Sequence, residues 1–282
     1  MAINFTNILQ VDVEDWYCDL DIKNWESQED RVVESTNKVL DILREANTLA
    51  TFFVLGYEAE HHPELVKRIK KEGHEIATHG YAHRPIMKET PREFEDDLLR
   101  SIKILEEIIG AEGERVLGYR APRFSITEET SWVIDILKQT GLKYDSSVFP
   151  VKTHLYGVPR APLFPYHISS SNIMIDYPAE DFLEIPLSVY EIPAISMNIP
   201  VAGGFYLRFF PYPFIKYALR KINRQNQVAV CYIHPWELDP QHPKIHSLGW
   251  YHYWRLASTE KKFRQLLRDF QFTSVSRRMN LG

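Results

Sequence analysis

Short apolar runs alternate with longer amphipathic segments along most of this 282-residue chain. The apolar runs have the length of buried strands, and the segments between them place apolar side chains at helical spacing, as Val39, Leu40 and Leu43 do. This alternation favours an α/β fold with a largely parallel sheet. We expect strands at Ile8–Val13, Ala50–Leu55, Glu75–Thr78, Val116–Tyr119, Lys143–Ser146, Val228–Ile233 and Phe272–Val275.

The alternation is interrupted between about residues 149 and 213, where prolines and polar turns accompany short β-like runs. We interpret this range as an irregular, β-rich insertion on one face of the fold. Such an insertion either shapes a binding cleft or is a plain surface elaboration. No Gly/Ser-rich or Pro-rich linker divides the chain, so the simplest prediction is a single domain over residues 1–282.

Composition argues against several kinds of partner. The chain has 33 Lys and Arg against 38 Asp and Glu, a net charge of −5, and these charges are scattered, so we expect no nucleic-acid partner. No apolar stretch approaches the roughly 20 residues of a membrane helix, and the N-terminus lacks the pattern of a signal peptide. With only two cysteines, the chain is predicted to be cytoplasmic.

Polar side chains stand at the carboxyl ends of five predicted strands. In a parallel α/β barrel this edge is where active sites are built, because the loops that follow the strands converge there. The sequence therefore predicts that one candidate site gathers Asp12 and Glu14, His79 and His83, Arg120, Asp145, and His234.

The first strand ends with an acidic pair. Asp12 and Glu14 lie on the same side of an extended strand, and Asp15 lies on the other. One of two neighbouring acids can bind a metal ion while the other accepts a proton. The alternative is an acidic turn before Trp16.

Two histidine pairs have the i, i+4 spacing that can bring two imidazoles to one ion. His79 and His83 directly follow a predicted strand, which favours them as ligands. His242 and His246 lie in a polar loop interrupted by proline, and we interpret them as solvated or structural.

Two further strand ends carry single candidates. Arg120 could fix a carboxylate in one orientation through paired hydrogen bonds, although an Arg-x-Pro sequence alone is only a loop. His234 has the position of a general acid, although a lone histidine at a strand end is often structural.

In this order, the pieces VDVEDW, THGYAH, GYRAPRF, KYDSSVFP and YIHPWE resemble the motifs of the NodB-homology polysaccharide deacetylases, carbohydrate esterase family 4. The resemblance runs from about Ile8 to Val275. The first motif is similar to that of the subgroup with Helicobacter-type peptidoglycan deacetylase and allantoinase-like proteins. The stretches LEIPLS and AGGFYLRFFPY resemble deacetylases encoded in bacterial exopolysaccharide and surface-glycan clusters.

The resemblance implies a role for each matched residue. Asp12 corresponds to the catalytic base, Arg120 to the residue that holds it, and His234 to the acid. The implied metal ligands are Glu14, His79 and His83, with Asp15 as a rival to Glu14. The resemblance places Phe124 and Asp145 at the cleft, and we expect Trp16, Tyr81 and Trp236 to bind the substrate with them.

The resemblance further implies a distorted (β/α)7 barrel and a hydrolase that removes N-acetyl groups from amino sugars and releases acetate. The expected cofactor is a divalent metal, zinc first and cobalt or a similar ion as alternatives. Two other functions are open: a C–N hydrolase of the same family that acts on a small cyclic amide or ureide, and a catalytically inactive glycan-binding barrel.

Overall fold

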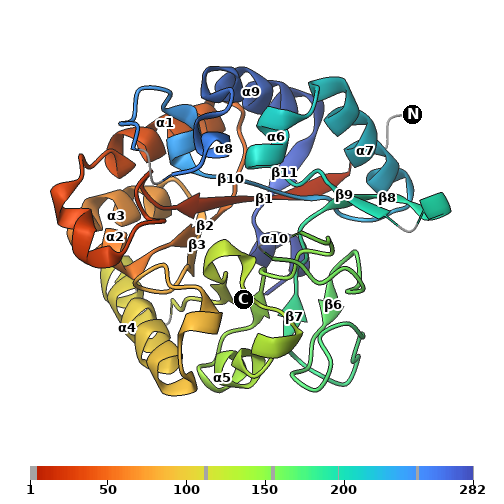
Figure 1. Cartoon of the computed structure of the whole chain (residues 1–282), viewed down its shortest axis with the longest axis horizontal. Helices are drawn as coiled ribbons and strands as arrows, with labels where there is room; N and C mark the ends of the chain where they lie inside the picture. The colour runs from red at the N-terminus through yellow and green to blue at the C-terminus, as the bar shows by residue number, and fades with distance from the viewer. Residues whose placement is uncertain (1–4, 111–113, 154–155, 196, 246–247, 282) are drawn as a thin grey trace.

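The computed structural model describes residues 5–110, 114–153, 156–195, 197–245 and 248–281. Its main sheet follows the order β10-β1-β2-β3-β4-β5-β7-β6, with β11 paired to the start of β1 (Figure 1). All neighbours on this path are parallel except the β7–β6 pair. The strands are β1 (Thr6–Val13), β2 (Thr51–Val54), β3 (Glu75–Thr78), β4 (Gly118–Tyr119), β5 (Tyr144–Asp145), β6 (Tyr166–His167), β7 (Leu183–Glu184), β10 (Val230–Ile233) and β11 (Gln271–Thr273).

The sheet curls until its two ends approach each other. The Ser188 amide, just beyond β7, donates to the Val230 carbonyl of β10 at 3.3 Å, and the Val230 amide donates to Ser188 Oγ at 2.7 Å. No ladder of the described residues joins β7 to β10. The mixed α/β class is thus confirmed, with a curled sheet in place of a regular closed (β/α)7 barrel.

The two faces of β1 pack against different layers. Leu9, Val11 and Val13 belong to the core beneath the helices, whereas Ile8 belongs to the core inside the curl. Because side chains alternate along a strand, Gln10 and Asp12 share the inner face with Ile8. The inside of the curl is therefore apolar at the start of β1 and polar at its end.

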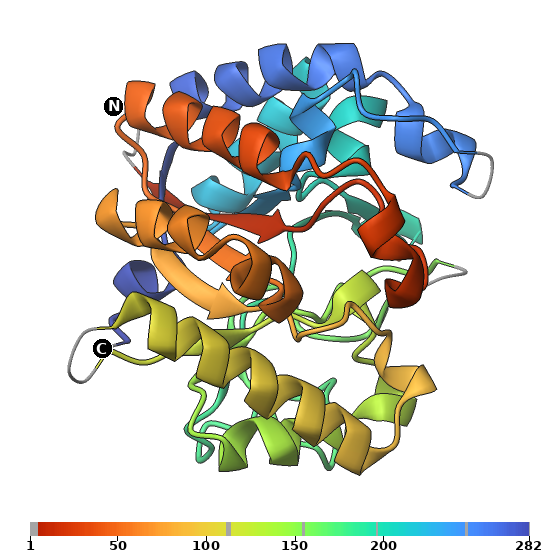
Figure 2. The same cartoon turned by 90° about the vertical axis from the view of Figure 1, so that its left-hand side faces the viewer.

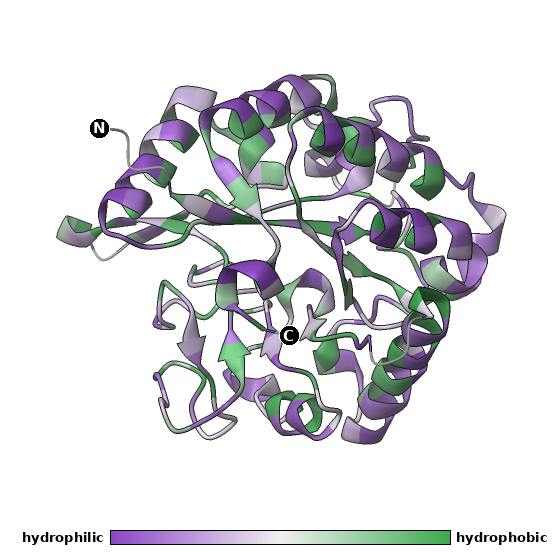
Figure 3. Cartoon of the chain, turned by 180° about the vertical axis from the view of Figure 1, so that it is seen from behind, coloured by the Kyte–Doolittle hydropathy of each residue, from purple (hydrophilic) through white to green (hydrophobic). Residues whose placement is uncertain are grey.

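Amphipathic helices cover the outside of the sheet, and Figure 3 shows hydrophobic and hydrophilic residues alternating along them. Thr90 and Glu93 form a capping box at the start of α4, and Gly110 ends that helix in the left-handed conformation, with φ 58°. The helices are α1 (Val32–Glu45), α2 (Gly56–His61), α3 (Pro63–Lys71), α4 (Pro91–Ile109), α5 (Val133–Gln139), α6 (Phe205–Phe209), α7 (Tyr212–Arg224), α8 (Trp250–Tyr253), α9 (Thr259–Asp269) and α10 (Val275–Met279). No helix among the described residues is both long and apolar enough to cross a membrane.

The range 149–213 is more than an added surface. It supplies β7, which pairs in parallel with β5 and continues the main sheet. It also contains the separate two-stranded sheet of β8 (Val189–Ile192) and β9 (Met197–Pro200). The sequence does not show β7 as a strand of the main sheet because β7 has only two residues and Pro186 follows it closely. The strand expected at Phe272–Val275 is present as β11, but it pairs only with the first part of β1.

Candidate active site

The strand ends bring the predicted reactive residues together in one cleft of about 670 Å³. Asp12 lies near the end of β1 and Glu14 directly follows this strand, His79 and His83 follow β3, and His234 follows β10. All five side chains line the cleft, while Arg120 lies buried behind Asp12. In Figure 2, β1 is the red arrow, and the chain continues from its tip into the red loop and short helix at the right of the view.

Glu14, His79 and His83 form a compact group of donor atoms within 4.8 Å of one another. Oε2 of Glu14 lies 2.8 Å from Nε2 of His83 and 3.7 Å from Nε2 of His79. The other ring nitrogens are already used, because Nδ1 of His79 donates to the Arg120 carbonyl at 2.8 Å and Nδ1 of His83 donates to the Cys18 carbonyl at 3.0 Å. Both Nε2 atoms are thereby directed at Glu14, and these are the nitrogens that neutral imidazoles would offer to a metal ion.

Glu14 is held in its ionised form. Burial alone raises its pKa, but the charges of His83 and His234 and the close polar contacts with the two cluster histidines outweigh burial, and the pKa lies well below its usual value. Its Oε2 atom is buried and makes no well-aligned hydrogen bond. An ionised, buried carboxylate oxygen that faces two imidazole nitrogens fits a divalent cation such as zinc.

Asp15 faces away from this cluster. Its Oδ2 accepts the backbone amides of Arg31 at 2.6 Å and Val32 at 2.8 Å, at the start of α1. Burial, opposed by these hydrogen bonds, raises the pKa of Asp15 to about 6. Asp15 thus binds a helix N-terminus, and the carboxylate beside the histidines is Glu14.

Asp12 is fixed by a buried arginine. Nη1 of Arg120 donates to Oδ1 of Asp12 at 2.6 Å, and Arg120 itself is fully buried. Its remaining donors bind the Ser146 carbonyl at 2.8 Å, Ser146 Oγ at 3.0 Å and the Gln10 side chain. The guanidinium therefore has one orientation, and it leaves Oδ2 of Asp12 facing the cleft.

His234 stands between the two carboxylates. Its Nε2 lies 3.4 Å from Oε1 of Glu14 and 3.8 Å from Oδ2 of Asp12. On the other side of the ring, Nδ1 lies 3.1 Å from Oε2 of Glu237. Burial lowers the pKa of His234, but the charge of Glu14 and the hydrogen bond to Glu237 outweigh it and raise the pKa to about 9. His234 is therefore protonated at neutral pH and can donate a proton.

Sequence reasoning missed Glu237 and its partner Arg208. Nε of Arg208 donates to Oε1 of Glu237 at 2.8 Å, and both side chains are buried. Glu237 also accepts the backbone amide of His234 at 3.2 Å, as in a capping box. The His-x-x-Glu spacing of HPWE was the available signal, because an acid three residues after a helix-start residue can reach back to it.

The predicted substrate-binding residues fall into two groups. Phe124 and Trp236 line the cleft, and Nε1 of Trp236 donates to Oε1 of Glu14 at 3.2 Å. Trp16, Tyr81 and Asp145 do not line it. Trp16 donates to the Glu29 carbonyl, Tyr81 donates to Glu60, and Asp145 accepts from Ser147. Of the second histidine pair, His242 is buried and stacks on Trp16, while His246 lies outside the described residues.

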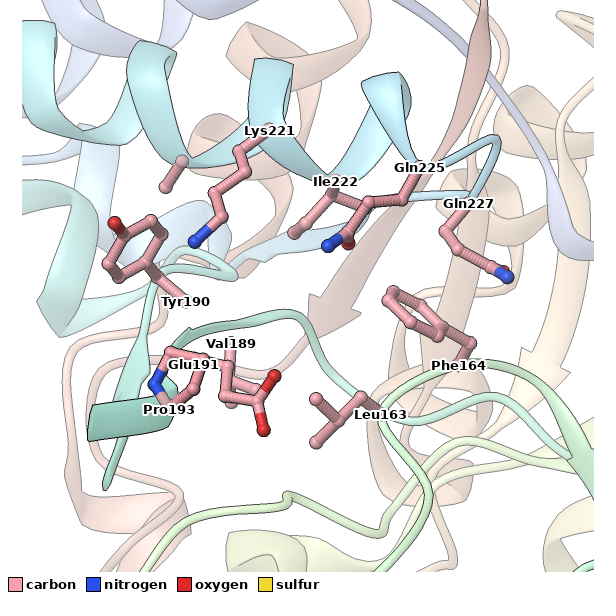
Figure 4. A pocket seen from close by; sticks show the side chains of 11 residues that line it. Leu163, Phe164, Val189, Tyr190, Glu191, Pro193, Lys221, Ile222, Gln225 and Gln227 are labelled. Carbon is pink, nitrogen blue, oxygen red and sulfur yellow. The ribbon is translucent and has the colours of Figure 1, made fainter. Parts of the chain in front are cut away.

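A second hollow, of about 310 Å³, lies between β8, α7 and residues 163–164 (Figure 4). Lys221 lies over the ring of Tyr190, with Nζ 4.5 Å from the ring centre. None of the residues predicted to carry chemistry lines this hollow. Asp12, Glu14, His79, His83 and His234 all line the larger cleft instead.

The curled, largely parallel sheet places a possible metal-binding acid–histidine cluster at the carboxyl ends of its strands, which defines an α/β protein with a candidate metal-dependent site. Comparisons with known proteins show what family its domain resembles. Residues 26–144 match the family model of the polysaccharide deacetylases, and residues 146–280 match that of a domain of unknown function, DUF3473. The chain thus contains a polysaccharide deacetylase domain of the NodB type, carbohydrate esterase family 4, matched over residues 26–144.

Several curated relatives match parts of the chain. It is 41% identical over 78 residues to a peptidoglycan-N-acetylglucosamine deacetylase of Bacillus cereus, which is 28% of each chain. It is 34% identical over 161 residues to a peptidoglycan deacetylase-like protein of Gibberella zeae, which is 56% of this chain and 44% of that protein. It is 31% identical over 111 residues to a peptidoglycan deacetylase of Helicobacter pylori, 39% and 36% of the two chains. The matches thus span less than half the length of these relatives.

A solved structure supports the fold over nearly the whole chain. A protein from Mycobacterium smegmatis assigned to the polysaccharide deacetylases superposes with a TM-score of 0.64 at 21% sequence identity. The superposition covers 99% of this chain and 92% of that one. The shared fold therefore includes both matched ranges, residues 26–144 with the histidine pair and residues 146–280 with His234.

Proposed function

We propose that this protein is a metal-dependent hydrolase that removes N-acetyl groups from the amino sugars of a bacterial polysaccharide or surface glycan and releases acetate. The observation that carries the proposal is the joint position of three units around one cleft: the Glu14, His79 and His83 cluster, the Asp12–Arg120 pair, and His234. Membership of the polysaccharide deacetylases supports the same reaction.

Glu14, His79 and His83 would hold the metal ion, with zinc as the expected ion and cobalt as an alternative. When bound, such an ion lowers the pKa of a water molecule toward neutrality and stabilises negative charge on the substrate oxygen. Three protein ligands leave a coordination position open, as a catalytic site requires.

Asp12 is the base in this proposal. Arg120 holds its Oδ1, so Oδ2 is free on the cleft side to accept a proton from the attacking water. The buried network of Arg120, Gln10 and Ser146 keeps that oxygen in one position. A carboxylate that is not a metal ligand can gain and lose a proton without disturbing the metal site.

His234 is the acid. An amine is a poor leaving group unless its nitrogen is protonated, and His234 carries a proton at neutral pH close to both carboxylates. Glu237 holds Nδ1, so the proton available to the substrate is the one on Nε2. Asp12 and His234 thus divide the two proton transfers of amide hydrolysis between them.

We further propose that both halves of the chain form one catalytic domain, since β10 of the second half pairs with β1 of the first and brings His234 to the metal cluster. The cytoplasmic location stays a prediction from the sequence. Relatives described as acting on peptidoglycan support a glycan substrate, and the LEIPLS and AGGFYLRFFPY stretches favour an exopolysaccharide or surface glycan.

The test is a comparison of substrates on the same zinc-loaded protein. We expect acetate release from the N-acetylglucosamine tetramer and no ring opening of allantoin. Ring opening without acetate release would replace the proposal with the cyclic-amide reaction. Tight binding of the tetramer with no turnover under zinc or cobalt would instead indicate an inactive glycan-binding protein.

A further inference from the structure

Four aromatic side chains, three of them exposed, form one wall of the active-site cleft. Phe205 and Phe209 come from α6, and Trp250 and Tyr251 come from α8; we call these four residues the aromatic wall. All four line the same cleft as Asp12, Glu14 and His234. The exposed fractions of Phe209, Trp250 and Tyr251 are 45%, 66% and 46%.

The rings of the aromatic wall are in mutual contact. Phe205 is at the centre: its ring centroid lies 5.5 Å from that of Phe209, 6.2 Å from that of Trp250 and 6.4 Å from that of Tyr251. Figure 1 shows α6 and α8 next to each other. The wall is thus a continuous apolar surface, and a soluble protein seldom leaves such a surface exposed without a ligand or partner.

A buried arginine fixes the aromatic wall to the acid of the proposed reaction. Nη1 of Arg208 donates to the carbonyls of Tyr251, His252 and Trp254 at 3.1, 3.0 and 2.8 Å. The same side chain donates to Glu237, which contacts His234. The wall therefore has a set position relative to the group that would protonate the leaving amine.

A second contact fixes the wall in the same way. The ring of His252, within α8, stacks on Trp236 with centroids 4.0 Å apart and planes at 11°, and Trp236 stacks in turn on His234. Burial lowers the pKa of His252 to about 3, so this ring stays neutral within the stack. Two independent connections thus join α8 to the reactive histidine.

We propose that the aromatic wall is a binding subsite for sugar units next to the one that is deacetylated, so that the enzyme prefers a glycan chain to a single sugar. The proposal rests on the proposed deacetylase function and extends it to substrate length. Sugar rings present apolar C–H faces that pack on aromatic side chains, and the wall carries no charged side chain of its own.

The size and position of the cleft favour a glycan as the occupant. Its volume of about 670 Å³ lies within the range of about 300–1,000 Å³ that accommodates ligands much larger than one acetamido group. The wall lines the same hollow as the proposed metal ligands, so a chain lying on the rings extends directly to the reactive group. A membrane surface is the alternative occupant of exposed aromatic residues, and the experiment distinguishes the two.

The experiment measures binding of the N-acetylglucosamine tetramer and monosaccharide to metal-free protein by calorimetry, and KM and kcat for both on zinc-loaded protein. The variants are Trp250→Ala and Phe209→Ala. We expect each to weaken tetramer binding by about 3- to 10-fold, the worth of one aromatic contact, with a smaller effect on the monosaccharide. In turnover, the tetramer KM should rise more than its kcat falls.

Two further variants sharpen the result. Trp250→Phe keeps an aromatic face and should recover most of the affinity for the tetramer. Tyr217→Ala removes an aromatic residue of similar exposure from α7, outside the cleft, and should leave tetramer binding unchanged.

Failure of this proposal and of the proposed function can be told apart. Acetate release with an unchanged tetramer KM in both alanine variants would overturn the subsite and leave the deacetylase standing. Trp250-dependent tetramer binding without acetate release would support the subsite and overturn the deacetylase. The subsite is also overturned if the wild-type protein does not bind the tetramer. Binding to vesicles of phosphatidylcholine and phosphatidylglycerol is measured on the same proteins. If the two alanine variants bound the tetramer as the wild-type protein does but lost binding to these vesicles, the wall would be a membrane contact.

Discussion

Asp12 and Glu14 are two residues apart on one strand face, yet their surroundings give them different tasks. Arg120 neutralises Asp12, and the histidine pair faces Glu14. We expect Asp12→Asn to keep bound zinc and to lose turnover by about 10²- to 10⁴-fold, because it lacks a base. Glu14→Ala should lose both zinc and turnover, because it lacks a ligand. Metal analysis and acetate assays on both variants check this contrast, and loss of zinc from Asp12→Asn would contradict it.

Glu237 should set the pH range in which His234 acts as an acid. An acid must be protonated, so activity falls as pH rises through the pKa of His234, which is raised to about 9. Glu237→Gln removes a negative charge from Nδ1 and so lowers this pKa. We expect the alkaline limb of the pH–rate profile to move down by about 1–2 pH units.

The matched control for Glu237→Gln is Asp239→Asn. Asp239 is two residues further along but forms an ion pair with Arg31 and does not touch His234. The alkaline limb of the pH–rate profile of the Asp239→Asn variant should match that of the wild-type protein. An unmoved limb in Glu237→Gln would mean that Glu237 has only a structural role.

Asp15 binds the backbone amides at the start of α1, so we expect Glu14 and not Asp15 to be the carboxylate ligand of the metal. Asp15→Ala removes the acceptor of two backbone amides at the start of α1, so we expect a loss of about 0.5–2 kcal/mol in the free energy of unfolding. Zinc content should stay at the wild-type level. Asp30→Ala, at a nearby half-exposed acid paired with His62, should change the free energy of unfolding by less than about 0.5 kcal/mol. A zinc-free Asp15→Ala protein would transfer the ligand role from Glu14 to Asp15.

The sequence predicted the long elements well and the short ones poorly. β1 has a full-length apolar pattern, and the structure has it at Thr6–Val13, close to the expected Ile8–Val13. β7 has two residues, too few for a periodic pattern, and only its pairing with β5 makes it part of the main sheet. Local pattern cannot show such a strand, because tertiary contacts form it.

The same distinction applies to the candidate site. Asp12, Glu14, His79, His83, Arg120 and His234 could be found from the sequence because each follows a strand and occupies a recognisable motif. Trp16 lies within a motif too, but its ring packs into the core beside His242. The aromatic wall lies on two helices that are far apart in sequence, so only the folded chain shows that its rings meet.

The whole molecule should lose stability in mild acid. His74 is buried, its Nδ1 accepts the Ala50 amide at 3.2 Å, and burial lowers its pKa to about 4. The unfolded chain takes up this proton near pH 6.5, whereas the folded chain does not, so stability falls as pH decreases from about 6.5 to 4. This group alone contributes a loss of about 2 kcal/mol at pH 5 relative to pH 7.

Urea unfolding at pH 7 and pH 5 measures this effect. In His74→Gln, the difference between the two pH values should shrink by that amount. His61→Asn changes an exposed histidine and should keep the wild-type difference. If His74→Gln showed the wild-type difference as well, the histidine would be protonated within the folded protein.

Metal titration of the wild-type protein tests the proposed metal-dependent deacetylation most directly. It has two readouts, bound zinc and acetate released from the N-acetylglucosamine tetramer. A chelator should remove one zinc per chain and abolish acetate release while the far-UV circular dichroism stays unchanged, since the core does not depend on the ion. Addition of one equivalent of zinc or cobalt should restore activity, and His79→Ala should not respond to it. Full acetate release from protein shown to be free of metal would contradict the proposed metal dependence.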